Sequence, residues 1–121
     1  MRIEVKGRNY PVTEEMRDTV ARRFRKVDAQ VSEFAELEIE LSEARNPAIA
    51  EPFQASATLR LKGVTLRSHD SRRDMKDAIH LIEEELSRQV KRHRVQRRHR
   101  RDARRTVQAR RTGAEGAAPP A

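Results

Sequence analysis

The sequence predicts an α+β domain in which two helices pack on one face of a four-stranded sheet, in the order β-α-β-β-β-α. Four segments alternate apolar and polar residues, as strands with one buried face do. Two other segments repeat apolar residues at intervals of three and four, as amphipathic helices do. Because each element has a single apolar face, a two-layer packing buries all of these faces in one core.

The first strand and the first helix are predicted within residues 1–31. Ile3 and Val5 alternate with charged residues in a short strand that ends at Gly7. Thr13 is a suitable N-cap for the helix that follows. A single helix of about five turns is expected, because its apolar residues share one face: Met16, Val20, Phe24, Val27 and Val31.

Three strands are predicted from residue 35 onward. The second strand alternates apolar residues with glutamates, so its outer face is acidic. After a loop bracketed by prolines, a third strand runs over residues 53–62, and Gly63 marks a turn into a fourth strand that ends near His69. These last two strands form a hairpin. Phe34, just before the second strand, is expected in the core.

The second helix is predicted to open at Ser71, which with Asp74 resembles a capping box. Beyond about Arg94 the helix is expected to fray, because the cations that follow repel one another in the absence of an anion. Residues 1–95 are therefore predicted to form one domain, and residues 96–121 a disordered, Arg-rich tail. The apolar stripe of this helix consists of Met75, Ala78, Ile79, Ile82, Leu86 and Val90.

The positive charge of the chain is concentrated at one end. Residues 1–87 hold 15 Lys or Arg and 17 Asp or Glu, a net charge of −2. Residues 88–121 hold 12 Lys or Arg and 2 Asp or Glu, a net charge of +10. A basic segment of this density favours contact with a polyanion. Composition alone leaves RNA, DNA and an acidic membrane surface open.

The type of cation and the scarcity of aromatic residues indicate how the chain would bind a nucleic acid. Two helices on one sheet face can present cations to folded RNA, which proteins recognise mainly by shape and backbone contacts. Arginine, which dominates the basic segment, donates two parallel hydrogen bonds to a phosphate. The chain has no Trp, 1 Tyr and 3 Phe, and with the Phe residues assigned to the core no platform for stacking bases is expected.

Enzymatic and metal-binding chemistry have no support in the sequence, so no catalytic residue, metal ligand or cofactor is predicted. There is no Cys, and the four His have no carboxylate or thiol partners at ligand spacing. The acids at positions 83–85 are expected on a solvated helix face, and a nuclease is the enzymatic alternative.

No apolar run approaches the roughly 20 residues that span a bilayer. A cytoplasmic monomer without membrane contacts or a small-molecule substrate is expected.

Two blocks of residues resemble the family of ribosome hibernation-promoting factors, also called ribosome-associated inhibitors or ribosomal subunit interface proteins. The first block covers the opening strand and helix: Gly7, Asn9, Thr13, Met16, Arg17, Val20, Arg23, Phe24, Lys26 and Val27. The second block is similar to the signature helix of the family: Asp74, Met75, Ala78, Ile79, Ile82, Leu86, Arg88, Gln89, Val90, Arg92, His93 and Arg94.

The resemblance implies a fold similar to a double-stranded RNA-binding domain and a site in the decoding channel of the small ribosomal subunit. A protein bound there blocks messenger and transfer RNA and promotes hibernation. The resemblance assigns rRNA contacts to Arg23, Lys26, Arg88, Arg92 and Arg94, and charge adds their neighbours. The full candidate set is Arg22, Arg23, Lys26, Arg88, Lys91, Arg92, His93, Arg94, Arg97 and Arg98.

Three features depart from the family pattern. Lys76 stands where many members have Tyr, and Glu85 stands where relatives often carry a basic residue. Long members append a domain that pairs two ribosomes, and the residues after Arg111 are not expected to form one. The alternative to a hibernation factor is a general RNA- or DNA-coating protein that binds through its Arg-rich tail.

Overall fold

The computed structural model describes the backbone of residues 1–116 and the side chains of residues 1–104. The chain divides into two compact units, Met1–Val90 and Lys91–Ala121. The helix α3 (Met75–Gly116) begins in the first unit and runs through the second. The other elements belong to the first unit: β1 (Arg2–Arg8), α1 (Glu14–Arg23), α2 (Arg25–Gln30), β2 (Glu36–Glu43), β3 (Phe53–Leu61) and β4 (Val64–Arg72).

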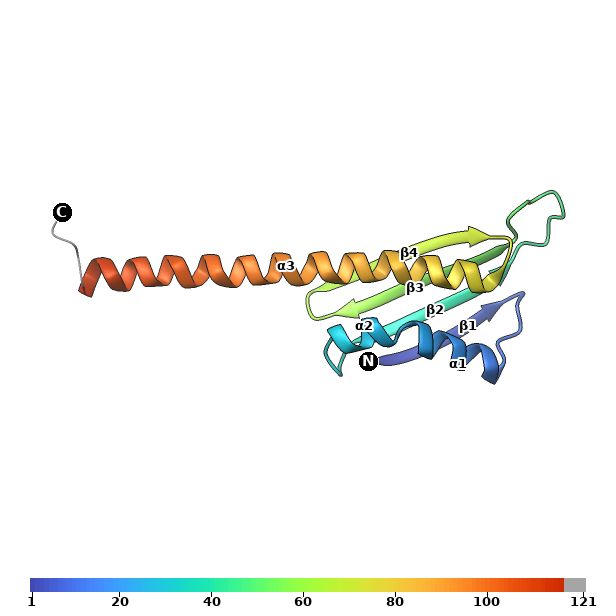
Figure 1. The fold of residues 1–121 in the computed structure, drawn as a ribbon, viewed down its shortest axis with the longest axis horizontal. Coiled ribbons are helices and arrows are strands. Elements are labelled where there is room, and N and C mark those ends of the chain that lie inside the picture. Colours follow the sequence, from blue (N-terminus) through green and yellow to red (C-terminus); the bar gives the residue numbers. More distant parts are fainter. Residues whose placement is uncertain (117–121) are drawn as a thin grey trace. The chain divides into compact units, whose positions relative to one another are not determined.

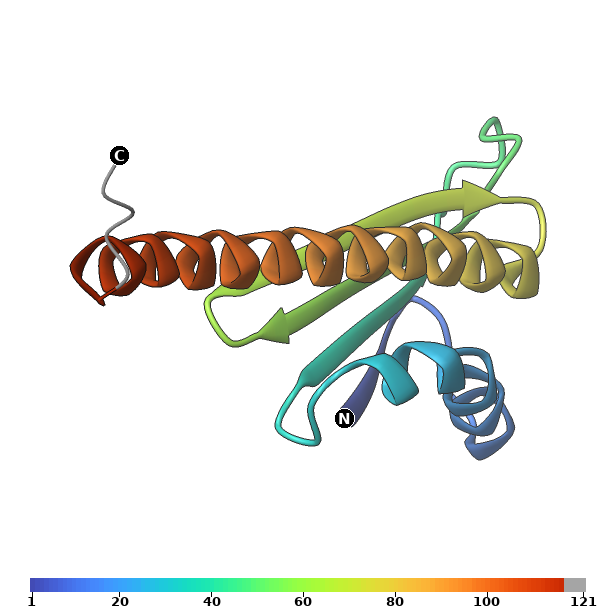
Figure 2. The same ribbon diagram turned by 60° about the vertical axis from the view of Figure 1, so that its left-hand side comes forward.

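The four strands form one mixed sheet in the order β1-β2-β3-β4. β1 is parallel to β2, with Val5 opposite Ile39. β2 and β3 are antiparallel, as are β3 and β4. In the first unit α1, α2 and the first part of α3 cover the same face of this sheet (Figures 1 and 2). The predicted α+β class and the two-layer arrangement are confirmed.

The core lies between the covered sheet face and the helices. Leu37, Ile39 and Leu41 of β2 point into it because side chains alternate across a strand. Ala55, Ala57 and Leu59 of β3 do the same. The small residues on β3 leave room for the larger helix side chains, in keeping with the density of protein interiors. The helices contribute Val20, Phe24, Val27, Met75, Ala78, Ile79, Ile82, Leu86 and Val90.

Two turns depend on their glycines. Gly63 has φ 80°, a left-handed conformation that glycine adopts without steric cost, and it closes the hairpin where Leu61 pairs with Val64. At Gly7 a Cβ atom would overlap the carbonyl oxygen of Tyr10. The chain therefore folds back closely on the end of β1, which places Tyr10 against Phe53 with ring centroids 6.2 Å apart.

The prediction of one continuous first helix is wrong. The helix is interrupted at Phe24, whose φ of −91° and ψ of 12° lie in the bridge region, and α2 begins at Arg25. Like charges three or four residues apart destabilise a helix, and four cations crowd this turn. Phe24 is nevertheless fully buried. The cations at the interruption are Arg22, Arg23, Arg25 and Lys26.

The predicted capping box at the start of the second helix is also wrong. Ser71 belongs to β4, which continues to Arg72 instead of ending near His69. Asp74 is the residue that caps α3. Its carboxylate accepts a hydrogen bond from the Lys76 amide at 3.0 Å, and its carbonyl oxygen accepts one from the Ala78 amide at 3.1 Å.

The backbone of α3 is helical to Gly116, past the point near Arg94 where fraying was expected. Arginine is among the better helix formers, and each like-charge pair costs only a few tenths of a kcal/mol, so the run of cations does not break the helix. Of the segment 112–121 that reads as disordered, residues 117–121 lie outside the described residues.

Two predictions about burial are corrected. Phe34 is not in the core, because 84% of its surface is exposed. Glu83 is not on a solvated face, because only 9% of its surface is exposed. The Ser87 hydroxyl donates to Glu83 Oε1 at 2.8 Å, so this carboxylate has a hydrogen-bond partner despite its burial.

Candidate nucleic-acid interface

The first group of candidate residues surrounds the interruption between α1 and α2. Arg22, Arg23 and Lys26 are exposed, because Val20, Phe24 and Val27 take the inward positions of these helices. None of the three forms an ion pair within residues 1–104, and Arg22 donates only a 3.4 Å hydrogen bond to the Thr19 hydroxyl. Their charges are therefore available to an external anion.

Arg25 completes this group and was not among the candidates drawn from the sequence. It is exposed and lines an open cleft of about 520 Å³ together with Arg22. The other lining residues are Ile3, Asp18, Ala21 and Asp28. Arg25 lies between the candidates Arg23 and Lys26 in the sequence and off the apolar stripe of the helix. The periodicity of the helix could therefore have identified it.

Arg88 is exposed on α3 but is held by an acid of its own helix. Its Nε and Nη2 atoms donate to Glu85 Oε2 at 3.2 and 2.8 Å. Gln89 donates to the other carboxylate oxygen of Glu85 at 3.2 Å and to the Arg67 carbonyl at 2.7 Å, which attaches this turn of α3 to β4. An anion that binds Arg88 must therefore compete with the Glu85 carboxylate.

The remaining candidates lie in the second unit. Lys91, Arg92, Arg94, Arg97 and Arg98 are exposed, whereas His93 is half-buried. Successive helix residues are rotated by about 100°, so cations at these spacings project in several directions around the axis. Such a helix suits phosphates that surround it better than phosphates on one side.

Within the first unit, the structure brings the cations of α1 and α2 into the same domain as Arg88. Phe24 and Val27 share a core with Leu86 and Val90, so the two basic groups project from segments that pack against the same sheet face. The candidates from Lys91 onward form a separate basic stretch of α3.

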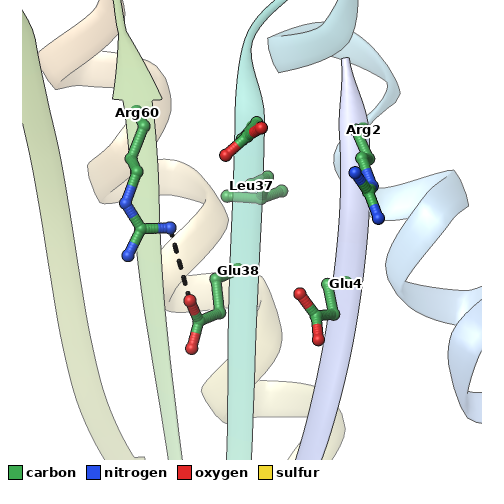
Figure 3. Close-up of a pocket in the computed structure, with 6 residues that line it drawn as sticks. Arg2, Glu4, Leu37, Glu38 and Arg60 are labelled. Carbon is green, nitrogen blue, oxygen red and sulfur yellow. Dashed lines mark hydrogen bonds and ion pairs between the residues drawn. The ribbon is translucent and has the colours of Figure 1, made fainter.

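The uncovered face of the sheet carries a different electrostatic pattern. Glu38 accepts a 3.3 Å hydrogen bond from Arg60, drawn as a dashed line in Figure 3. The Lys6 ammonium lies 3.5 Å from the same carboxylate. The hydrogen bond from Arg60, together with the charge of Lys6, holds the pKa of the Glu38 carboxyl below its usual value. Glu38 of β2 thus pairs with two cations of this face, whereas Arg22, Arg23 and Lys26 on the helices have no ion pair within residues 1–104.

The described residues contain no group of three or more His, Cys, Asp or Glu side chains that could hold a metal ion. The half-buried His80 has one carboxylate partner, because its Nε2 atom lies 2.8 Å from Glu84 Oε1 one helical turn later. No helix among the described residues is long and apolar enough to cross a membrane.

A family model described as "Sigma 54 modulation protein / S30EA ribosomal protein" matches residues 3–98 of the chain. A curated relative, a ribosome hibernation promotion factor of Picosynechococcus sp., is 25% identical over 95 residues. The match covers 78% of this chain and 49% of the relative, so the chain spans about half the length of that protein.

Solved structures share the fold. The N-terminal domain of Protein Y from Thermus thermophilus matches with a TM-score of 0.66 and 27% identity, over 76% of this chain and 98% of that domain. A ribosomal subunit interface protein from Coxiella burnetii matches with a TM-score of 0.66 and 15% identity, over 78% of this chain and 99% of that one. The second similarity concerns the fold alone.

Proposed function

Because the chain belongs to the Sigma 54 modulation protein / S30EA ribosomal protein family, we propose that it is a ribosome-associated translation inhibitor. On this proposal it binds rRNA of the small subunit in the decoding channel, blocks messenger and transfer RNA, and promotes hibernation. It acts in the cytoplasm, as a monomer when off the ribosome, without a cofactor and without catalysis. The kinship to a hibernation promotion factor supports this choice over other RNA-binding roles.

The observation that carries the proposal is the cluster of exposed, unpaired cations on α1 and α2. Arg22, Arg23 and Lys26 form no ion pair among the described residues, whereas Lys6 and Arg60 on the uncovered sheet face are paired with Glu38. A phosphate can meet the helix cations without displacing an acid of the protein. The helix side is therefore the side that we assign to rRNA.

On this proposal the two differently charged parts of the chain have different roles. Residues 1–95 form the ribosome-binding domain, whose shape selects the site. Residues 96–121 form a basic tail that adds electrostatic affinity through counterion release from the RNA. Because residues 96–121 hold 8 Lys or Arg and 2 Asp or Glu, a net charge of +6, the tail adds to the long-range attraction that the few cations of α1 and α2 exert.

The alternative is a general RNA- or DNA-coating protein. The observation that favours it is the distribution of cations around the axis of α3 beyond Val90, since such a helix can bind many polyanions without selecting among them. Defined occupancy of one site per ribosome separates the two proposals.

The test is co-sedimentation with purified ribosomes over a salt series, with transfer RNA as a competitor. We compare the full chain, a chain cut after Arg94, and a triple variant with Arg22, Arg23 and Lys26 replaced by Ala. A matched control replaces Lys6, Arg60 and Arg72, each of which is paired with an acid, by Ala. We expect saturation near one copy per ribosome, displacement by the competitor, and survival of binding after truncation.

The triple variant should bind more weakly, and its slope of log K against log salt should be shallower by about 2 to 3, because each lost phosphate contact removes about 0.7 to 0.9. The control variant should keep the slope of the parent. Unsaturable binding that disappears with the tail would instead support the coating protein.

A further inference from the structure

Phe34 is an aromatic side chain that the fold leaves in water. It is 84% exposed, whereas Phe24 is fully buried and Phe53 packs against Tyr10. The other large apolar side chains exposed within residues 1–104 are Ile49, in the loop between β2 and β3, and Val95, in the second unit. Because the loop of Ile49 is at the opposite end of β2, Phe34 is an isolated ring and not part of an apolar patch.

The backbone around Phe34 is held in place by hydrogen bonds. The Phe34 amide donates to the Ser32 hydroxyl at 3.1 Å, and the Ala35 amide donates to the Ser32 carbonyl oxygen at 3.0 Å. The Ala35 carbonyl oxygen accepts from the Arg2 amide at 2.9 Å, which ties the loop to β1. The ring therefore projects from an ordered turn, and little conformational freedom is lost when a partner covers it.

The charges near Phe34 nearly balance. β2 begins at Glu36, which lies opposite Arg2 of β1 and Arg60 of β3 in the register of the sheet. The turn that contains Lys62 lies at this same end of the sheet (Figures 1 and 2), and Glu33 precedes Phe34 in the sequence. A phosphate gains little here, but an uncharged aromatic base can approach without repulsion.

We propose that Phe34 stacks on an unpaired RNA base, while phosphates of the same RNA meet cations such as Lys26. This inference rests on the proposed function, which supplies the RNA. A stacking contact needs one accessible ring, whereas a protein-docking surface needs a contiguous apolar patch. The polar and charged neighbours Ser32, Glu33 and Glu36 provide no such patch. Phe34 thus adds a contact with a base to the phosphate contacts of the helix cations.

The first experiment measures ribosome binding of the full chain over a salt series for Phe34→Ala, Phe34→Leu and Phe34→Trp. Stacking on an aromatic side chain is worth about 1 to 3 kcal/mol per base, so Phe34→Ala should weaken binding by on the order of 5- to 150-fold. The salt slope should not change, because no phosphate contact is lost. Phe34→Leu should behave like Phe34→Ala, and Phe34→Trp should bind at least as tightly as the parent.

The second experiment uses fluorescence and does not depend on the ribosome. Because the chain has no Trp, the Phe34→Trp variant contains a single indole. We expect its emission to be quenched by a single-stranded RNA oligonucleotide and to remain unchanged with an RNA duplex of equal length, whose bases are already stacked. Thermal unfolding of Phe34→Ala should match that of the parent, because the ring buries little surface in the fold.

Several outcomes would overturn the inference. If Phe34→Ala binds like the parent while Lys26→Ala binds more weakly, stacking is wrong and the proposed function stands. If Phe34→Leu keeps full affinity, the ring fills an apolar pocket of a protein. If the parent protein does not saturate on ribosomes, the proposed function is wrong. If single-stranded and duplex RNA quench the emission of Phe34→Trp equally, the stacking contact is wrong too.

Discussion

Glutamate side chains determine which cations of this chain are free to meet a phosphate. Glu38 holds Lys6 and Arg60 on the uncovered sheet face, and Glu85 holds Arg88 on α3. Arg23 and Lys26, in contrast, have no ion pair among the described residues. The number of cations therefore overstates the charge that is available for binding, and the pairing of each cation must be considered separately.

Replacing Glu85 by Gln should strengthen RNA binding. The substitution keeps a hydrogen-bond acceptor for Gln89 but removes the charge that competes with a phosphate for Arg88. Exposed ion pairs are worth about 0.2 to 1 kcal/mol, so affinity for ribosomes should rise by roughly 1.4- to 5-fold at low salt. Ribosome co-sedimentation at low and moderate salt measures this change.

Glu84→Gln is the matched control, because it removes the same charge from the same helix but from a carboxylate that contacts His80. The gain should be larger for Glu85→Gln than for this control. Equal gains would show that only the net charge matters, and weaker binding of Glu85→Gln would mean that Glu85 positions Arg88 productively.

At the scale of whole elements, the start of α3 shows how a cap is selected. Ser71 and Asp74 both have side chains that cap helices well, and their spacing resembles a capping box. Ser71 is not available, because β4 continues through it and pairs Arg72 with Phe53. The tertiary pairing of a strand therefore sets where the helix begins.

Asp74→Ala should destabilise the first unit by about 1 kcal/mol, the usual cost of losing an N-cap side chain. Ser71→Ala should have a smaller effect, because the Ser71 side chain does not cap the helix. Urea denaturation followed by circular dichroism measures both changes. A larger loss of unfolding free energy for Ser71→Ala than for Asp74→Ala would support the capping box and contradict the observed start of α3.

The type and order of the elements could be predicted because periodicity records which face of each element is buried, although the first predicted helix proved to be two helices. Their ends could not, because they depend on pairing and on local backbone geometry, as at Phe24 and Ser71. Phe34 was assigned to the core from its residue type alone. It is one position out of phase with Ala35, Leu37 and Ile39, which all point inward, so the alternation already indicated exposure.

The candidate site was predictable in residue type but not in pairing. The sequence identifies Arg22, Arg23 and Lys26 because they lie off the apolar stripe of a helix. Glu38 can pair with both Lys6 and Arg60 only because of the register of β1, β2 and β3. This register cannot be read from any short stretch of the sequence. Which sheet cations are already paired with an acid therefore becomes visible only in the assembled sheet.

For the molecule as a whole, the charge follows the division into two units. The buried core residues among positions 1–104 all lie in Met1–Val90, whereas residues 91–121 hold 11 Lys or Arg and 2 Asp or Glu, a net charge of +9. Stability and long-range attraction to a polyanion are thus carried by different parts of the chain. Removing the basic end of the chain should weaken its attraction to a polyanion and leave its stability unchanged.

A chain cut after Arg94 should unfold in urea at the same midpoint as the full chain, because the core residues that the structure describes all lie before the cut. Its ribosome binding should depend less on salt, since each lost phosphate contact lowers the slope of log K against log salt by about 0.7 to 0.9. The cut removes eight cations from Arg97 to Arg111. An unchanged slope would show that none of them contacts phosphate, and a lower midpoint would show that the tail stabilises the fold.

The mixed sheet also has a consequence for the order in which the domain assembles. β2, β3, β4 and the start of α3 follow one another in sequence with antiparallel neighbours, so their contacts close short loops. β1 is different, because it joins β2 in parallel only after α1 and α2 have crossed between them, and it has a neighbour on one side only. We expect β1 to be the last strand to join the folding domain and the first whose amide protons exchange with solvent.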